Sequence, residues 1–576
     1  MSSSKELLHS QQTDRPLPPA LNENYADFII EYRGDLSWLG DPRLLQDISV
    51  IDSRFAVLYV PDTYVSLNTF TAASYGNTPK CYTYMDTASL NESGISRIQN
   101  HPYLDLKGRE TAVAIIDSGI DYTLPEFRNS DGTTRIAYLW DQRLTDAPPP
   151  DGFEYGSEYT AQDINQALKA ADPHQLVPST DDNGHGTFLA GIAAGGENPA
   201  HSFSGVAPLS TLIVIRLKPA KKYLRDLFLL PPDQDVYQEN DIMLAVRYAM
   251  KCSEKLHNIP VSICIGLGSN FGSHTGVSPL EQYLDSVGRM FRTCICLPAG
   301  NEGNARGHYH GINVPGPAPD IAELRVAEKE PGFTLELWGN SLEPYFLTLQ
   351  SPSGESAQVI PSRSNSTQEI RFIFTRSVIY ITSIPLDRAS GNQVIVFRFL
   401  TPDAGIWKFS VATDSPTEVS YHMWLPVRGL IKEETYFLRS SPYETVTAPG
   451  ASQSPITVTA YDYRNMSLYL EASRGFTPLS AVKPELAAPG VELIGPLPGG
   501  RFTTRSGTSL AAAHTAGVAA LIFEWAVTRQ NIIGLNGIGL KNLLIRSARR
   551  TDNVSYPSRE WGYGILDLYN SFATLF

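Results

Sequence analysis

Apolar runs of strand length alternate with helical segments over two long stretches of the chain, residues 88–315 and 447–576. The strand-like runs include TAVAIID, TLIVIRL, VSICIGLG and RTCICLPAG, and helical segments such as QENDIMLAVRYAMKCSEKL separate them. A strand that is apolar at nearly every position is buried on both faces, which is typical of a parallel sheet covered by helices. The pattern predicts an α/β fold with a parallel sheet for these two stretches.

Two further regions have different patterns. Residues 1–87 contain strand-like runs around a helical piece, DLSWLGDPRLLQD, and predict a small α+β unit. Residues 316–446 have many short β-like runs and almost no helical pattern, which predicts an inserted all-β sandwich or jelly roll. This segment holds Trp338, Trp407 and Trp424, which need a core to cover them, so we expect it to rigidify the α/β unit.

The segment SGTSLAAAHTAG, residues 506–517, places Ser509 at the start of an apolar helix. Serine is a favoured helix N-cap, so a purely structural role fits this position. A nucleophilic serine needs more: a base, a residue that orients the base, and donors for an oxyanion. The segment alone is compatible with both interpretations.

Three polar residues elsewhere in the α/β stretches have the chemistry that such a serine needs. Asp117 ends the apolar run TAVAIID, His185 lies in the glycine-flanked corner NGHGTF, and Asn301 follows the run ending in LPAG. Open α/β sheets carry their sites at the carboxyl ends of strands, where these residues fall. Each also has a structural alternative, because Asp and Asn favour turns and a lone His is often a surface or core residue.

Together, the four residues follow the chain order Asp, His, Asn, Ser, which is one of the recurring orders of a catalytic triad with its oxyanion residue. The stretches AIIDSGID, NGHGTFLAGIAAG, LPAGNEG, SRGFTPLSAVKPELAAPG and SGTSLAAAHTAG resemble those of the subtilisin-like serine proteases, the subtilases. In the serine motif, family members usually have Ser-Pro directly before the motif's own histidine, here His514, where this chain has Ala512-Ala513. That difference leaves the serine untouched.

The resemblance implies a serine endopeptidase. Ser509 would attack the scissile carbonyl, His185 would act as the base, and Asp117 would orient the imidazole. The side chain of Asn301 and the backbone N–H of Ser509 would hold the oxyanion. Gly266, Leu267 and Gly268 match the strand that pairs with substrate in this family, where glycine lets the substrate backbone approach closely.

At the level of architecture the chain is similar to the Csp germination proteases of clostridial spore formers, and in particular to the active, CspB-type members. That similarity implies that residues 1–87 are a prodomain, acting as intramolecular chaperone and inhibitor, and that residues 316–446 are a jelly-roll insertion. We expect self-cleavage between Thr87 and Ala88, with Tyr84 as the P4 side chain. The cleaved prodomain would stay bound beside Gly266–Gly268 as a product-like inhibitor.

The same similarity implies a substrate, namely the precursor of a spore cortex hydrolase that is activated during germination. The expected partners are this protein substrate, the chain's own prodomain and related Csp-type proteins. Two alternatives stay open: an intracellular housekeeping subtilase, and a non-catalytic germination signalling scaffold on a protease fold.

Charge and composition exclude several other classes. The net charge of −14 argues against nucleic acid or anionic lipid as a main partner. No apolar signal region and no membrane span are expected, so we expect cytoplasmic synthesis, with deposition in the spore. Five cysteines are an odd number for a disulfide framework and indicate a reducing compartment.

No cofactor is expected from the sequence. The acidic loops LTDAPPPDGFEYGSEY and DSPTEVS lack the ligand spacing of an EF-hand, which leaves a structural calcium site open. Cys294 and Cys296 would share one face of a strand, where a metal pair is an alternative to small buried core residues.

Overall fold

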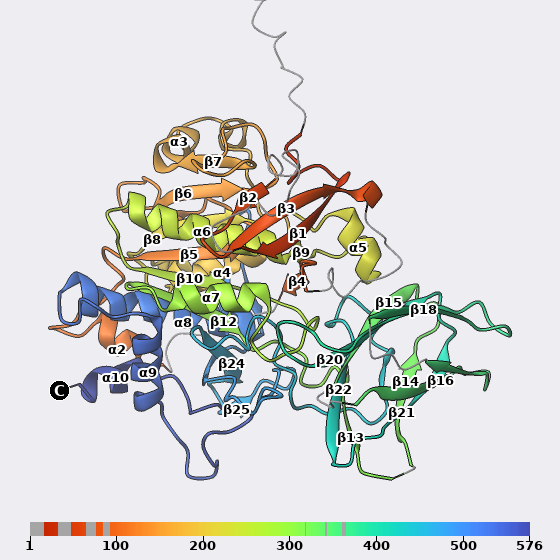
Figure 1. The fold of residues 1–576 in the computed structure, drawn as a ribbon. Coiled ribbons are helices and arrows are strands. Elements are labelled where there is room, and N and C mark those ends of the chain that lie inside the picture. The colour runs from red at the N-terminus through yellow and green to blue at the C-terminus, as the bar shows by residue number, and fades with distance from the viewer. Residues whose placement is uncertain are drawn as a thin grey trace, which may run out of the picture.

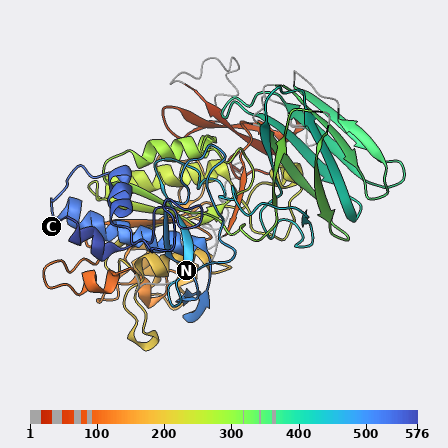
Figure 2. The ribbon, with the colours of Figure 1, turned by 90° about the horizontal axis from the view of Figure 1, so that it is seen from below.

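A layered α/β unit, a two-sheet β unit and a small N-terminal sheet make up the fold (Figure 1). The structure is a computed structural model, and the residues that it describes are 17–32, 48–64, 76–84, 93–316, 318–339, 343–359 and 365–575. The β unit lies at one end of the layered unit, next to the N-terminal strands, as the view from below also shows (Figure 2).

The layered unit is built on a nine-stranded sheet in the order β25-β24-β12-β10-β5-β8-β6-β7, with β26 paired to β24. Its strands are β5 (Ala112–Asp117), β6 (Ile136–Asp141), β7 (Ser157–Thr160), β8 (Thr211–Arg216), β10 (Val261–Ile265), β12 (Thr293–Pro298), β24 (Ile456–Asp462), β25 (Ser467–Leu468) and β26 (Leu486–Pro489). All of its neighbours are parallel except β6 with β7 and β24 with β25. The predicted sheet is therefore present, and antiparallel edge strands make it mixed.

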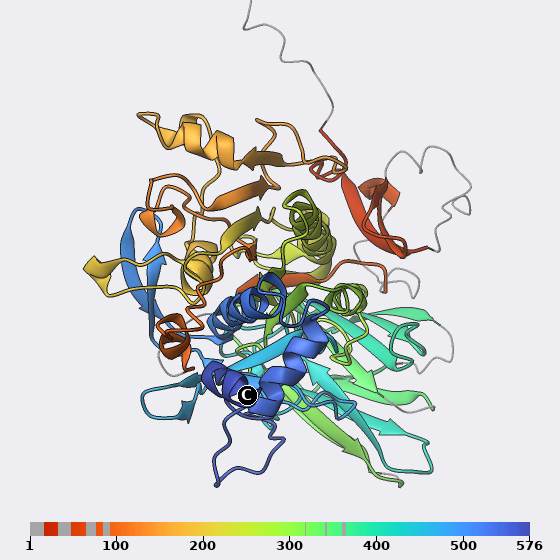
Figure 3. The ribbon, with the colours of Figure 1, turned by 90° about the vertical axis from the view of Figure 1, so that its left-hand side faces the viewer.

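Helices cover both faces of this sheet because alternate residues of the buried strands point to opposite sides. In β5, Val113 and Ile115 pack in one apolar cluster with α4 (His185–Ala194) and α8 (Thr508–Phe523). Ala112, Ala114 and Ile116 pack in a second cluster with α6 (Glu239–Lys255) and α7 (Pro279–Gly288). Figure 3 shows the layered unit from the end at which the C-terminus lies. The remaining helices are α2 (Ile95–Gln99), α3 (Ala161–Ala167), α5 (Lys222–Phe228), α9 (Gly537–Ser547) and α10 (Leu568–Ala573).

The helical segment Thr508–Thr528, which includes α8, is long and apolar enough to cross a membrane by length and composition. The expectation that no stretch of the chain approaches such a span is wrong in this respect. The whole of its most apolar window is buried inside the protein, where it packs against α4 and the sheet. Its apolar character is that of a core helix.

The N-terminal unit has three antiparallel strands in the order β1-β3-β2, namely β1 (Tyr25–Glu31), β3 (Phe55–Pro61) and β2 (Ile48–Val50). Residues of β1 and β3 belong to the same apolar cluster as α6 and α7, so this unit packs on that face of the layered unit. The helical piece predicted between the first strands, residues 35–47, lies outside the described residues.

The β unit consists of two antiparallel sheets that share one apolar core. The six-stranded sheet is ordered β13 (His308–Asn313), β22 (Val419–Trp424), β15 (Gly332–Gly339), β20 (Gln393–Leu400), β19 (Val378–Ile384), β18 (Ser366–Arg371). The five-stranded sheet is ordered β17 (Ser356–Val359), β16 (Tyr345–Gln350), β21 (Gly405–Thr413), β14 (Asp320–Val326), β23 (Tyr436–Phe437). The first of these strands, β13, begins before residue 316, where the sequence pattern placed the start of the insertion.

Strand β15 of the six-stranded sheet is buried on both faces. Phe333, Leu335 and Leu337 of β15 point into the core between the sheets, together with Trp407. Trp338, like Trp424, belongs instead to a cluster with α5 and the loop after β11 (Leu267–Gly268). Two of the three tryptophans therefore attach the β unit to the layered unit, which the sequence alone did not distinguish from a role in the β core.

Candidate active site

Asp117, His185 and Ser509 meet at the carboxyl edge of the nine-stranded sheet. Asp117 is the last residue of β5, His185 is the first of α4, and Ser509 is in the first turn of α8. His185 Nδ1 lies 2.7 Å from Asp117 Oδ1, and His185 Nε2 lies 3.2 Å from Ser509 Oγ. All three residues are at most 3% exposed. A hydroxyl, a base and a carboxylate in this sequence of contacts can activate the hydroxyl as a nucleophile.

The carboxylate of Asp117 is oriented by the backbone N–H of the next residue. Ser118 N donates to Asp117 Oδ1 at 2.8 Å, so this oxygen accepts two hydrogen bonds. Asp117 Oδ2 makes no hydrogen bond within the described part of the chain. A Cβ on Gly266 would lie 2.8 Å from Oδ2 and 3.2 Å from His185 Cε1. Gly266 therefore leaves room for the Asp–His pair, a role beyond the substrate contact that the sequence predicted.

Ser509 is not the N-cap of its helix. Gly507 occupies that position, and no side chain caps the helix there. The structural interpretation of Ser509 as a cap is therefore wrong, because the helix begins at Thr508 and the Ser509 hydroxyl faces His185 instead.

Asn301 lies beside the start of α8, in the loop after β12. Its Oδ1 accepts hydrogen bonds from Thr508 N at 3.2 Å and from Thr508 Oγ1 at 3.1 Å, while Thr508 Oγ1 accepts one from Gly300 N at 3.1 Å. With Oδ1 held in this way, the Nδ2 group remains as a donor on the other side of the amide. Thr508 thus positions Asn301, and sequence reasoning missed it although it precedes Ser509 directly.

Asp181 is a second residue that sequence reasoning missed. Its carboxylate accepts from Ser118 Oγ at 2.7 Å, from Gly184 N at 3.1 Å and from Thr187 N at 2.8 Å. Asp181 therefore joins the turn after Asp117 to the turn that begins α4. The signal in the sequence was the run DDNGHG, whose acidic residues precede the histidine.

The strand of the predicted substrate site already has a partner. Cys81–Tyr84, strand β4, pairs antiparallel with β11, with Tyr84 opposite Leu267 and Thr83 opposite Gly268. Its Cys81 end also pairs with β9 (Tyr237–Gln238). The proposed cleavage bond between Thr87 and Ala88 lies outside the described residues, three residues beyond the end of β4.

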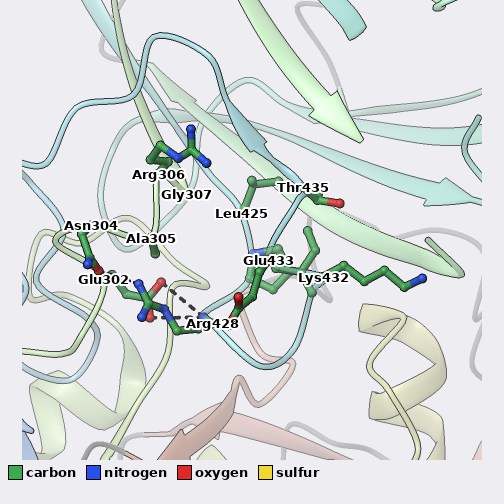
Figure 4. Close-up of a pocket in the computed structure, with 12 residues that line it drawn as sticks. Glu302, Asn304, Ala305, Arg306, Gly307, Leu425, Arg428, Lys432, Glu433 and Thr435 are labelled. Atoms are coloured by element: carbon green, nitrogen blue, oxygen red, sulfur yellow. Dashed lines mark hydrogen bonds between the residues drawn. The ribbon is translucent and has the colours of Figure 1, made fainter. Parts of the chain in front are cut away.

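Two other features, a group of buried cysteines and a pocket beside Glu302, do not contact the Asp117–His185–Ser509 group among the described residues. Cys264, Cys294 and Cys296 are buried core residues on adjacent strands, and burial raises the pKa of the Cys264 and Cys296 thiols, which disfavours metal-binding thiolates. A pocket of about 200 Å³ lies beyond Asn301, lined by Glu302 and the loop around Arg428 (Figure 4).

A family model described as "Subtilase family" matches residues 108–227 and 438–564, which carry Asp117, His185 and Ser509, whereas Asn301 lies between the two matched ranges. Among solved structures, the chain is similar to that of the Clostridium perfringens CspB protease, with 31% identity and a TM-score of 0.75. That similarity covers 84% of this chain and 96% of the CspB chain.

Curated relatives include the PI-type proteinase of Lactococcus lactis subsp. cremoris, 24% identical over 242 residues, and the PII-type proteinase of Lacticaseibacillus paracasei, 24% identical over 240 residues. Each alignment covers 41% of this chain and only 11% of the length of the relative.

Proposed function

The chain belongs to the subtilase family, and on that premise we propose that it is a serine endopeptidase with Asp117, His185 and Ser509 as its catalytic triad. The observation that carries the proposal is the pair of contacts through His185, 2.7 Å to Asp117 and 3.2 Å to Ser509. The order of these residues along the chain is the one that subtilisin has.

In the proposed reaction, Ser509 Oγ attacks the carbonyl carbon of the scissile bond while His185 Nε2 takes its proton. The imidazolium then gives this proton to the departing amine, which leaves an acyl group on Ser509. A water molecule attacks that acyl group while His185 Nε2 takes its proton. His185 then returns the proton to Ser509 Oγ as the acid product leaves. Asp117 Oδ1 accepts the Nδ1–H of His185, which keeps Nε2 free as the base and stabilises the charge on the ring.

The tetrahedral intermediate requires donors for its oxyanion. We assign this role to the Asn301 Nδ2 group and the Ser509 backbone N–H, which lies at the positive end of α8. The two hydrogen bonds from Thr508 to Asn301 Oδ1 support this assignment because they fix the amide before substrate arrives. Loss of one such donor typically costs about 3 kcal/mol of transition-state stabilisation.

We further propose that the first substrate is the chain itself, cut between Thr87 and Ala88. The pairing of β4 with Leu267–Gly268 supports this, since β4 runs toward the proposed bond in the manner of a bound substrate strand. After cleavage, residues 1–87 would remain in place as a product-like inhibitor.

For the later substrate we propose the precursor of a spore cortex hydrolase. Its support is the similarity to CspB, which covers 84% of this chain. That similarity therefore extends beyond the two segments that the family model matches, 108–227 and 438–564. The prodomain and jelly-roll assignments of the N-terminal and β units rest on the same similarity.

The test compares the wild-type chain with Ser509→Ala. Mass spectrometry of the wild type should find two co-purifying pieces, the smaller near residues 1–87, and only one intact chain in the variant. Hydrolysis of a peptide substrate and of the purified hydrolase precursor should be lost in the variant by several orders of magnitude. The stability of the variant should change little, because Ser509 does not cap its helix.

A serine-reactive fluorophosphonate distinguishes the alternatives. Because β4 fills the strand site, labelling is best measured after the N-terminal fragment has been displaced by mild denaturant. A protease labels at Ser509, whereas a signalling scaffold does not label. Undiminished hydrolysis by Ser509→Ala would end the protease proposal, and hydrolysis of the peptide but not of the precursor would end the proposal of the substrate.

A further inference from the structure

Histidines gather where the β unit meets the segment that leads back to the layered unit. His308 and His310 are on β13, and His422 is on the neighbouring strand β22, with His310 directly opposite His422. Glu444 lies on the returning segment between β23 and β24. We propose that His308, His422 and Glu444 bind a divalent transition-metal ion of the zinc type. Nothing in the proposed peptidase mechanism uses these residues.

The spacing of the donor atoms supports the proposal. One ligand atom from each of the three residues lies within 4.8 Å of the others. His308 Nε2 and His422 Nδ1 are 3.0 Å apart. Two imidazole nitrogens bound at about 2.0–2.1 Å to one tetrahedral zinc ion lie roughly 3.3 Å apart, so a small rotation of the rings would accommodate the ion.

An unsatisfied buried carboxylate oxygen faces this pair. Glu444 is 7% exposed, and its Oε1 accepts from Arg559 Nη1 at 3.1 Å, whereas Oε2 has no hydrogen bond among the described residues. A buried carboxylate oxygen without a partner is costly, and a cation would remove that cost. His310 Nδ1 lies 3.8 Å from the same oxygen, which makes His310 a candidate fourth ligand.

The two imidazoles are held in place by aromatic stacking. The Trp424 ring lies 5.0 Å from the His308 ring and 5.0 Å from the His422 ring, nearly parallel to both. His274 stacks on Trp424 at 4.1 Å, but both of its nitrogens contact backbone carbonyls, of Val446 and Asn270, so it is not a ligand. A site whose ligands are already oriented requires little rearrangement when the ion binds.

The donor set selects the class of ion. Calcium and magnesium prefer sites made of oxygen atoms, whereas two imidazoles and a carboxylate suit zinc, cobalt and nickel. The ion would link β13 and β22 to the returning segment that carries Glu444. Three residues later in that segment, Thr447 N donates to Ala299 O at 2.9 Å, and Ala299 is two residues before Asn301.

The test uses the full-length Ser509→Ala chain, so that autolysis does not interfere and the outcome does not depend on peptidase activity. After dialysis against a chelator, the protein is titrated with Zn²⁺ and, separately, with Co²⁺. We expect one Zn²⁺ per chain by elemental mass spectrometry, a visible Co²⁺ absorption band of a site with nitrogen ligands, and a rise in Tm with Zn²⁺.

Two ligand variants and one control complete the test. Glu444→Gln keeps the shape of the side chain and its contact with Arg559, and His422→Gln removes one imidazole; each should weaken Zn²⁺ binding at least about 10-fold. His257→Gln removes an exposed histidine and should change nothing. Circular dichroism checks that the variants fold. Unchanged Zn²⁺ binding in a folded Glu444→Gln or His422→Gln protein, or no retained ion in the parent, would overturn the proposal.

Discussion

At the scale of single residues, Glu302 is a buried acid directly after Asn301. It is 4% exposed and accepts hydrogen bonds from the backbone N–H of Arg428, and burial raises its pKa to about 7. The folded chain therefore holds a proton on Glu302 at a pH where the unfolded chain has lost it. The stability from this group is fully present below pH 4.5 and is lost as the pH rises through 7, by about 3 kcal/mol in total.

We therefore predict that Glu302→Gln removes part of the pH dependence of stability. Between pH 5 and pH 8 the free energy of unfolding of the parent should fall relative to that of the variant. Urea denaturation at both pH values, in the Ser509→Ala background, measures the difference. Glu433→Gln, which removes an exposed carboxylate from the rim of the same pocket, is the control. Equal pH dependence in parent and Glu302→Gln would contradict the prediction.

The candidate site residues at strand ends could be located from the sequence. Asp117 and His185 stand in short motifs whose local structure follows from the motif itself. The His308–His422 pair could not be predicted, because 114 positions separate the two residues and only the pairing of β13 with β22 brings them together. The role of Gly266 beside Asp117 was hidden for the same reason.

At the scale of elements, strand β1 is attached to the layered unit through a buried ion pair. Asp27 is fully buried and accepts from Lys221 Nζ at 2.5 Å, from Gln238 Nε2 at 2.7 Å and from Asn240 Nδ2 at 3.0 Å. Removing one partner of a buried pair leaves an uncompensated charge, here that of Lys221, and typically costs about 3–5 kcal/mol.

Asp27→Ala should therefore loosen the N-terminal unit and release peptidase activity earlier in the processed chain. The measurement is the amount of fragment 1–87 that stays bound in gel filtration, together with the rate of peptide hydrolysis. Glu31→Ala is the matched control, because its ion pair with Arg54 is exposed and worth only about 0–1 kcal/mol. Equal retention of the fragment in both variants would show that the buried pair does not hold the unit.

The prediction of elements depended on how each one is buried. The run of β10, apolar except at Ser262, was readable as a central strand, since it is buried on both faces. Strand β15, FTLELWG, alternates in sequence as a half-exposed strand does, yet every residue in it is buried. Its polar face is covered by another unit, with Thr334 Oγ1 bonded to Phe228 O, and no local pattern reports such a contact.

At the scale of the whole molecule, the β unit is joined to the layered unit through an apolar and hydrogen-bonded contact. Trp338 packs in one cluster with Leu224 and Phe228 of α5, and Gly272 N donates to Glu336 Oε2 at 2.9 Å. These contacts support the prediction that the β unit stabilises the layered unit, although they do not test it.

Trp338→Ala should lower the stability of the entire chain, by about 3–5 kcal/mol if the two units unfold together. Differential scanning calorimetry checks this, with one transition at a lower Tm as the expected result. Ile373→Ala, which removes an 85% exposed side chain from the same β unit, should leave Tm unchanged. A variant in which the β unit melts first while the layered unit keeps its original Tm would contradict a stabilising role.

Strand β4 is paired to two neighbours, with Thr83 and Tyr84 opposite β11 and Cys81 and Tyr82 opposite β9. A segment held in this way must lose its hydrogen bonds to both neighbours before it leaves. Its departure is a unimolecular event, so the delay between the proposed cleavage and the onset of activity would have a fixed half-time. The length of that delay would not change when the protein is diluted, and it would shorten only when something pulls on the strand or cuts it.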